Sequence, residues 1–470
     1  MNNNITKPFI YTILIFLALV LVSYIVGAQP SSGPLSAAGD PSARLSPQEQ
    51  IKALSLDEAL SLAMQNNREI RIASLDIARS QQEKIVARSN GLPAVGVNGL
   101  ASHYFQLPPF FGLNYDGSGD KVPYQRYGGK DQFSATLWVT QSLYNPVTRP
   151  AVQRSEKAEQ QSRLLLGDKQ AAISAGVRQT YLQILVLGER IRLQKESLGR
   201  NQKALEDARS LLAQGRALRV DTLRAFTSVK NLEPDLLRLS YAIEVGKLRL
   251  KTLIGIDSSR DIALSDSLVL PAPAPIPTEE EVYAEAEKNR PDLLALNIQT
   301  GIDEQQILLA AAARKPSVSL VGQYQLQTQA SRFDYFDAYY PSTPFVGAQV
   351  TVPLSSGNAN LAKVREARLT QQQSVTRYDN AREQLRADVR QAVANGLEAA
   401  SRIQTRITVK EAARLSYDIT QYRYANGVAS RLELTDAELA FTTAQSNYLE
   451  AVYDYISSLI ELDRTRGRVR

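Results

Sequence analysis

The chain contains no cysteine, a single histidine and a single tryptophan among its 470 residues. Without cysteine there can be no disulfide, no thiolate nucleophile and no cysteine-ligated metal. One histidine, His103, argues against histidine-rich zinc sites and against a Ser-His-Asp triad. No pair of carboxylates stands in a plausible pocket, so we expect no enzyme, no cofactor and no bound metal.

Charge of one sign is not concentrated anywhere along the chain. The 54 basic residues exceed the 48 acidic ones and give a formal net charge of +6. Basic and acidic residues alternate along helical stretches instead of forming blocks. This pattern indicates a solvated charged surface, and we expect no nucleic-acid partner.

The one long apolar run is at the N-terminus. Lys7 precedes an apolar stretch from Phe9 to Val26, and small residues up to Ala28 offer a cleavage site. We therefore interpret residues 1–28 as a signal peptide and 29–50 as a flexible leader. An uncleaved membrane anchor is the alternative, since the run is nearly long enough to span a bilayer. The absence of cysteine rules out a thioether-linked lipoprotein.

The chain repeats itself. Seven residues return 223 positions later: Ala63/Ala286, Asn66/Asn289, Gln82/Gln305, Ala87/Ala310, Pro93/Pro316, Val95/Val318 and Gly99/Gly322. Others return after 212 positions: Gly215/Gly427, Ala225/Ala437, Tyr241/Tyr453, Leu250/Leu462 and Gly255/Gly467. We divide the chain into repeat 1 (51–256), a linker rich in proline and serine (257–278) and repeat 2 (279–467).

Each repeat is predicted to run helix, strand, strand, helix, helix. Apolar residues recur at three- and four-residue steps from Leu56 to Ser89, which indicates one helix. Residues alternate between apolar and polar in four later segments, about 93–105, 132–144, 316–328 and 345–354. A period of two places one face of each strand in an apolar medium and the other in water.

Aromatic residues crowd the loops beside these strands. The first loop, 106–130, and the second, 329–344, contain Phe110, Phe111, Tyr115, Tyr124, Tyr127, Phe333, Tyr335, Phe336, Tyr339 and Tyr340. Such crowding is typical of a membrane-interface girdle. Four strands cannot close a barrel, and open edges are not tolerated in a bilayer. If these are membrane strands, several chains must share one barrel, with a twelve-stranded trimer or an eight-stranded dimer as candidates.

The predicted helices are too long for an ordinary domain. From about Pro150 to Ala213 the pattern continues for on the order of 95 Å of rod. Apolar residues spaced seven apart predict supercoiling with neighbouring helices. Gly215 ends this helix, and the chain returns to about Leu253. The second copy runs from about Leu361 to Ala425, turns at Gly427 and returns.

Four local patterns now indicate a family. They are Leu54-Ser-Leu56-Asp-Glu-Ala59 with Asn66-Asn67; Asn289-Arg290-Pro291-Asp292-Leu293; Val352-Pro353-Leu354 before Gly357; and Tyr424-x-x-Gly427 before Glu433-x-x-Asp436. In order and spacing they resemble the outer-membrane efflux proteins of the TolC family, over essentially all residues after about 50.

The resemblance implies a mainly helical fold with membrane strands. Three chains would form a twelve-stranded outer-membrane β-barrel, continued by a long periplasmic α-helical barrel. Such a channel-tunnel would be the exit duct of a tripartite efflux or type I secretion system in a Gram-negative bacterium. Its partners would be a periplasmic adaptor, an inner-membrane pump of RND or ABC type, and outer-membrane lipid.

The resemblance also implies roles for residues at the two hairpin tips. Glu433 and Asp436 match the acidic positions that ring the tunnel's narrow mouth. Three residues match or lie near closed-state tip contacts: Asp221, Tyr424 and Arg431. Six match the turns that meet the adaptor: Gly215, Ala217, Leu218, Gly427, Val428 and Ala429. Ala429 departs from the family pattern, which has a gating arginine there. Glu433 could equally be the acid of a capping box that starts at Ser430.

The sequence is also compatible with a second class of protein. A periplasmic coiled-coil adaptor, a structural component of an export complex, would also contain a long helical hairpin. Adaptors usually contain one hairpin flanked by lipoyl-like and small barrel domains, whereas this chain has two hairpins and amphipathic strands. Nothing in the sequence identifies the cargo.

Overall fold

The computed structural model divides the chain into two units, Met1–Lys52 and Ala53–Arg470. Only the second contains described residues, which are 54–111, 124–271, 275–330 and 339–468, with the backbone of 114–115 and 121–122. The expected signal peptide and leader lie outside them. So do three aromatic residues of the second loop, Phe333, Tyr335 and Phe336.

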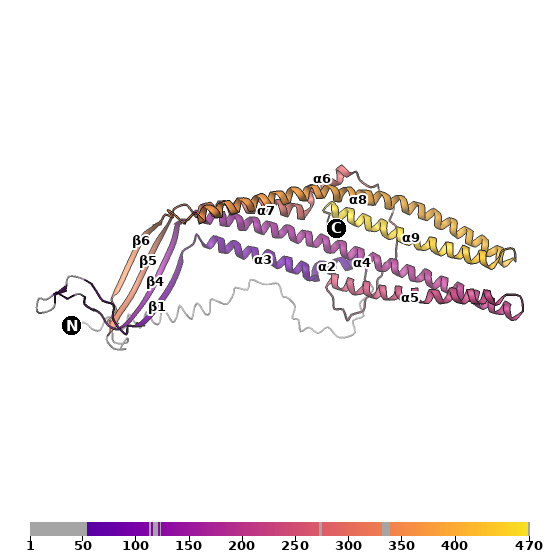
Figure 1. Ribbon diagram of the computed structural model, residues 1–470, viewed down its shortest axis with the longest axis horizontal. Helices are drawn as coiled ribbons and strands as arrows, with labels where there is room; N and C mark the ends of the chain where they lie inside the picture. The colour runs from indigo at the N-terminus through magenta and orange to yellow at the C-terminus, as the bar shows by residue number, and fades with distance from the viewer. Residues whose placement is uncertain are drawn as a thin grey trace. The chain divides into compact units, whose positions relative to one another are not determined.

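The two repeats contain nearly the same elements in the same order. Repeat 1 forms α2 (Leu56–Asn66), α3 (Arg68–Ser89), β1 (Ala94–His103), β2 (Asn114–Tyr115), β3 (Lys121–Val122), β4 (Asp131–Tyr144), α4 (Thr148–Ala213) and α5 (Arg219–Ile254). Repeat 2 forms α6 (Glu279–Asn289), α7 (Pro291–Ala312), β5 (Ser317–Ala330), β6 (Ser342–Thr351), α8 (Ala359–Ala425) and α9 (Arg431–Thr465). In repeat 1 the short β2–β3 hairpin lies between β1 and β4 along the chain, and the four long strands of both repeats lie side by side (Figure 1).

The prediction of one helix from Leu56 to Ser89 is wrong, because the helix breaks at Asn67. The backbone of Asn67 is extended, and its side-chain oxygen accepts hydrogen bonds from the backbone N–H groups of Glu69 (2.8 Å) and Ile70 (3.2 Å). Its amide nitrogen donates to the carbonyl oxygen of Leu253 (2.7 Å). Asn67 thus starts a new helix and ties it to the end of α5.

The four long strands form one antiparallel sheet in the order β1-β4-β5-β6. One row of directly opposed residues is Asn98, Thr136, Gln325 and Thr343. The adjacent positions face the other way and include Val97, Leu137 and Tyr324. We call these two sides the polar face and the apolar face. Among the described strand residues, the polar face contains no Asp, Glu, Lys or Arg.

The apolar face is uncovered in the single chain. Val95 is 63 % exposed and Val346 is 78 % exposed. The outer strands β1 and β6 each have one neighbour in this sheet. An exposed apolar face with two open edges indicates that the sheet is part of something larger.

In both repeats, the glycine after the last helix packs against the asparagine that ends the first helix. Gly255 ends α5 with φ 73°, and an added Cβ there would overlap the carbonyl of Asn66 at the end of α2. In repeat 2, Gly467 has φ 74° and packs in the same way against the carbonyl of Asn289, which ends α6. The repeated Asn and Gly of the sequence are therefore a contact pair in space.

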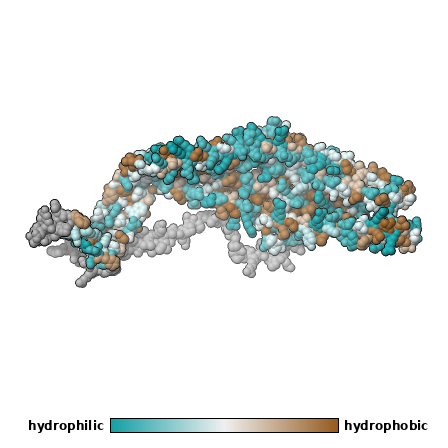
Figure 2. Space-filling view, in the orientation of Figure 1, coloured by the Kyte–Doolittle hydropathy of each residue, from teal (hydrophilic) through white to brown (hydrophobic). Residues whose placement is uncertain are grey.

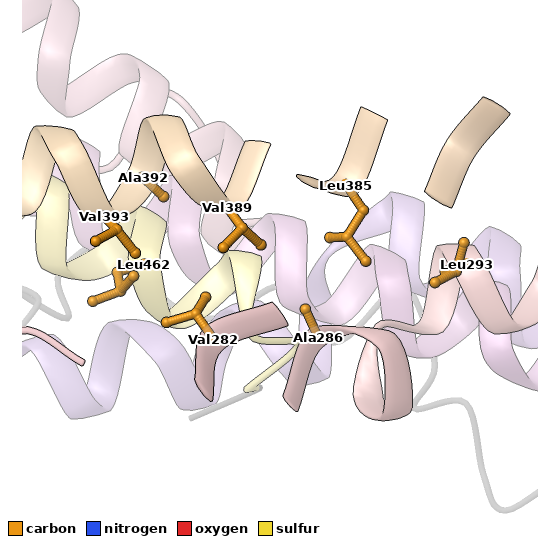
Figure 3. Close-up of a cluster of buried hydrophobic side chains, with 8 residues drawn as sticks. All are labelled: Val282, Ala286, Leu293, Leu385, Val389, Ala392, Val393 and Leu462. Atoms are coloured by element: carbon orange, nitrogen blue, oxygen red, sulfur yellow. The ribbon is translucent and has the colours of Figure 1, made fainter. Parts of the chain in front are cut away.

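One buried cluster lies where α6 and α7 pack against α8 and α9. Its residues are Val282, Ala286, Leu293, Leu385, Val389, Ala392, Val393 and Leu462 (Figure 3). The long helices bury narrower stripes. On α4, Val177 and Ile184 are buried, whereas Leu212 near the tip is 37 % exposed. Much of each rod is therefore uncovered in the single chain.

The linker between the repeats pairs with the residues that lead into α2. The backbone N–H of Leu54 donates to the carbonyl of Ala263 (2.8 Å), and Leu54 accepts from Ser265 (3.0 Å). The Asp266 carboxylate accepts from the backbone N–H of Leu56 (2.9 Å) and from the hydroxyl of Tyr181 (2.9 Å). The linker thus fastens the start of repeat 1 to the middle of α4.

Candidate functional site at the hairpin tips

The first hairpin turns at Gly215, between α4 and α5. Gly215 has φ 68°, and its N–H donates to the carbonyl of Leu212 (2.9 Å). The next N–H, of Arg216, donates to the carbonyl of Leu211 (2.8 Å). Glycine suits this position because other residues rarely adopt positive φ. An added Cβ would meet nothing within 4 Å, so the glycine is required by the backbone and not by crowding.

The second hairpin turns in the same way at Gly427. Gly427 has φ 74°, and its N–H donates to the carbonyl of Tyr424 (3.0 Å). The N–H groups of Val428 (2.9 Å) and Ala429 (3.3 Å) both donate to the carbonyl of Arg423. The six residues predicted to meet an adaptor thus belong to two closely similar turns.

Apolar side chains project from both turns. Leu218 is 70 % exposed and Val428 is 67 % exposed, whereas Ala217 and Ala429 are half-buried. Figure 2 shows hydrophobic side chains gathered at this end of the two long hairpins. Exposed apolar groups on a tight turn are typical of a contact surface.

The helix after the second turn begins with a complete capping box. The Ser430 hydroxyl accepts from the Glu433 backbone N–H (3.2 Å), and Glu433 Oε1 accepts from the Ser430 backbone N–H (3.1 Å). These bonds to Ser430, assisted by the charge of Arg423, hold the pKa of Glu433 below its usual range. Glu433 therefore has the capping role that the sequence left open. Asp436 lies one turn later, and both carboxylates are exposed.

The structure brings together some of the predicted tip contacts and not others. The guanidinium of Arg431 lies 5.7 Å from the centre of the Tyr424 ring, which is a cation–π contact within the second tip. Asp221 lies on the first tip, where its carboxylate accepts from the backbone N–H of Leu218 (3.3 Å). Among the described residues, no hydrogen bond or ion pair joins Asp221 to Tyr424 or Arg431 within one chain.

A buried polar contact between the two hairpins was missed by the sequence analysis. Glu438 on α9 is 8 % exposed, and its Oε1 accepts from Arg200 Nε (3.0 Å) and Asn201 Nδ2 (3.1 Å), both on α4. The signal was present, since Glu438 follows the buried Leu434 by four residues and so falls on the packed side of α9. A charge there requires a partner.

Aromatic packing surrounds this contact. Tyr417 of α8 stacks on Phe441 of α9, with ring centres 5.6 Å apart and planes 14° apart. The guanidinium of Arg200 lies 5.9 Å from the centre of the Tyr417 ring. Three helices from two repeats therefore meet at Arg200, a few turns from the tips.

The described residues show neither a metal centre nor a helical membrane span. No group of three or more His, Asp or Glu side chains among them could hold a metal ion. Within the same described ranges, no helix is both long enough and apolar enough to cross a membrane.

Comparison with known proteins identifies the family. The model of the family described as outer membrane efflux protein matches residues 59–256 and 282–468, one match for each repeat. The chain belongs to this family. Its fold is the TolC-like one predicted from the sequence, mostly helical with a small sheet and built from two repeats.

Individual relatives are distant but span most of the chain. The proteases secretion protein PrtF of Dickeya chrysanthemi is 23 % identical over 432 residues, which are 88 % of each chain. The cation efflux system protein CusC of Escherichia coli O6:H1 is 23 % identical over 419 residues, 86 % of this chain and 83 % of CusC. The CmeC outer membrane channel of Campylobacter jejuni superimposes with a TM-score of 0.74 at 16 % identity, covering 88 % of this chain and 85 % of CmeC.

Membership of the outer membrane efflux family places the protein in the outer membrane of a Gram-negative bacterium, extending into the periplasm. It serves as an exit duct of an efflux or secretion system, as the sequence predicted. Members of the family are parts of multi-component efflux or secretion complexes, and its structural neighbours are channel proteins.

Proposed function

We propose that three copies of this chain close one twelve-stranded barrel. The observation that supports this most strongly is the four-stranded sheet, with open edges at β1 and β6 and an uncovered apolar face. Unpaired backbone groups are not tolerated in the hydrocarbon of a bilayer, so β6 of one copy must pair with β1 of the next. Three copies give a lumen wide enough for a pathway, whereas two would give a barrel filled by its own side chains.

The helical hairpins then form the wall of a periplasmic tunnel. Their tips would be its inner end, where a periplasmic adaptor docks on the turns at Gly215 and Gly427. The exposed Leu218 and Val428 supply the apolar contacts of that docking. An inner-membrane pump of RND or ABC type would deliver cargo through the complex, and the duct itself performs no chemistry.

The gate of the tunnel would lie on α9 near the second tip. Glu433 and Asp436 are both exposed in one chain, and three copies would place six carboxylates around one opening. A ring of like charges in a narrow throat attracts cations and repels anions. The closed state would be held by Tyr424 and Asp221, which would tie neighbouring tip hairpins together, with Arg431 packed against the Tyr424 ring.

The assembly is tested by mass measurement and by crosslinking. Native mass spectrometry of the protein in detergent should give three chains. Because the chain has no cysteine, single cysteines introduced on β1 and β6 will form only the intended disulfides. Pairs across the β6–β1 seam should crosslink chains into a covalent ladder that ends at three. A stable monomer, or a ladder that ends at two, would contradict the proposal.

The gate is tested by ion selectivity. Glu433→Gln with Asp436→Asn should lower cation selectivity in single-channel recordings and weaken block by multivalent cations. Glu366→Gln, an exposed acid at the far end of α8, is the matched control and should leave both unchanged. If the double variant lost stability with no change in selectivity, Glu433 would be a helix cap alone.

A further inference from the structure

Two large aromatic side chains lie on the polar face of the sheet, in a single row across the four strands. That row is Gly96, Trp138, Gln323 and Phe345, each residue directly opposite the next. Trp138 is the only tryptophan of the chain. Among the described strand residues, this face also contains Leu100 and Val321 but no charged side chain, and the two rings are its largest groups.

Each ring packs against the backbone of a glycine. A Cβ added to Gly96 would come within 2.5 Å of the Trp138 indole, and one added to Gly347 would come within 3.0 Å of the Phe345 ring. The sheet therefore covers one side of each ring, and the remaining exposed area is on the side that points away from it. Phe345 is still 49 % exposed and Trp138 is half-buried.

Gln323 separates the two rings and is held in place. It stands opposite Trp138 on one side and Phe345 on the other, and its amide donates to Oε1 of Gln325 (3.0 Å). Trp138 and Phe345 are two strands apart, which is roughly 10 Å between their backbones. A flat molecule of two or three fused rings could stack on either ring.

We propose that Trp138 and Phe345 of three copies form an aromatic belt inside the barrel, at which planar aromatic cargo stacks during passage. The inference rests on the proposed trimer, whose symmetry brings the three copies of each ring to one height. The polar face is the one that must line the lumen, because the opposite face is apolar. Flat rings bind flat aromatic molecules by stacking, and bind cationic ones more tightly through cation–π attraction.

The first test uses the single tryptophan as its own reporter. In liposomes, aqueous acrylamide should quench the fluorescence of the assembled trimer, and phospholipids with brominated acyl chains should not. Gly96→Ala pushes the indole off the sheet and should shift its emission. Gly99→Ala is the matched control on the same strand, since an added Cβ there meets nothing within 4 Å, and its emission should stay unchanged.

The second test measures residence in the lumen. Single-channel recordings are made with ethidium, a planar aromatic cation, and with tetrapropylammonium, a cation without rings. Ethidium should block for longer, and Trp138→Ala or Phe345→Ala should shorten its dwell time about fivefold, the range of one stacking contact. Trp138→Phe keeps a ring and should restore most of the dwell time. Block by tetrapropylammonium should not change.

The outcomes separate the belt from the assembly. A trimer whose tryptophan is quenched by brominated lipid, or a conducting trimer in which Trp138→Ala leaves ethidium block unchanged, overturns the belt and leaves the duct intact. A monomer with no conductance overturns the proposed trimer and the belt together. If Trp138→Ala failed to assemble, Phe345→Ala and Gly96→Ala would decide the question.

Discussion

The two hairpin tips have the same turn but differ in how the helix after the turn begins, which is α5 in the first hairpin and α9 in the second. Gly215 and Gly427 have nearly equal φ values, 68° and 74°, and the same pattern of turn hydrogen bonds. After the second turn, Ser430 and Glu433 cap each other reciprocally. After the first, Leu218 has no side-chain acceptor, and Asp221 satisfies a single N–H at 3.3 Å.

The returning helices differ as well. Pro234 lies inside α5, where it removes one hydrogen bond of the helix, whereas the equivalent position of α9 is Ser446. We therefore expect the second hairpin to be the stiffer of the two. It is also the hairpin with the proposed gate acids. We infer that a rigid second tip positions the carboxylates, while a more pliable first tip absorbs movement when the tunnel opens.

The largest effect should come from breaking the contact that ties the two hairpins together. Glu438→Ala leaves Arg200 and Asn201 without their shared acceptor in a mostly buried contact. Because the side chain of Arg200 is still 27 % exposed, the loss should be about 2–3 kcal/mol, below that of a fully buried pair. This loss of stability can be measured by monitoring thermal unfolding with circular dichroism.

Glu196→Ala is the matched control for this contact. Glu196 pairs with Arg192 on its own helix, and both side chains are about half exposed, so its loss should cost less than about 0.5 kcal/mol. Equal effects of the two substitutions would show that the buried contact does not couple the hairpins.

The next effect should come from removing the proline that distinguishes the two returning helices. Pro234→Ser gives α5 the residue that α9 has and restores a backbone donor. We expect the first hairpin to gain about 1–2 kcal/mol, less than the full cost of proline because the surrounding helix has adapted to it. Amide hydrogen exchange of α5 should slow around residue 230. Unchanged exchange there would contradict the idea that α5 is the softer helix.

How much of the hairpins could be predicted from the sequence depends on how far apart the interacting residues lie along the chain. The turns at Gly215 and Gly427 and the box of Ser430 and Glu433 are local, so short motifs predict them. The contact of Arg200 with Glu438 joins residues 238 positions apart, and only packing reveals it.

The sheet shows the same limit of prediction from sequence. Alternation along the chain separates its two faces, and the register confirms that separation. That Trp138 lies opposite Gly96 depends on the pairing of two strands, which alternation does not determine. The break at Asn67 was missed for a related reason, because the apolar pattern continues through it while the side chain caps a new helix.

A smaller effect should come from exchanging the caps of the two tips. Ser430→Leu removes the hydroxyl acceptor at the start of α9 and should cost about 1 kcal/mol, and Leu218→Ser should add a comparable amount to the start of α5. Hydrogen exchange in the first turn of each helix measures both changes. The double exchange should invert the order of protection of the two tips. If Leu218→Ser gave no gain, the first tip would be limited by its turn and not by its cap.

The smallest effect should be a dependence of the second tip on pH. Hydrogen bonds from Ser430 lower the pKa of Glu433 in the folded chain, so its ionised form is favoured by folding. A lowered pKa stabilises the cap fully above the ordinary glutamate value of about 4.3, and this stabilisation is lost as the pH falls through the lower folded value. Protection of the first turn of α9 against hydrogen exchange, corrected for the intrinsic rate, should therefore fall below about pH 4. Glu433→Gln should abolish that dependence, because a neutral amide accepts the same bonds at every pH. If protection fell equally in the Glu433→Gln variant, the acid sensitivity would come from another group and not from the capping box.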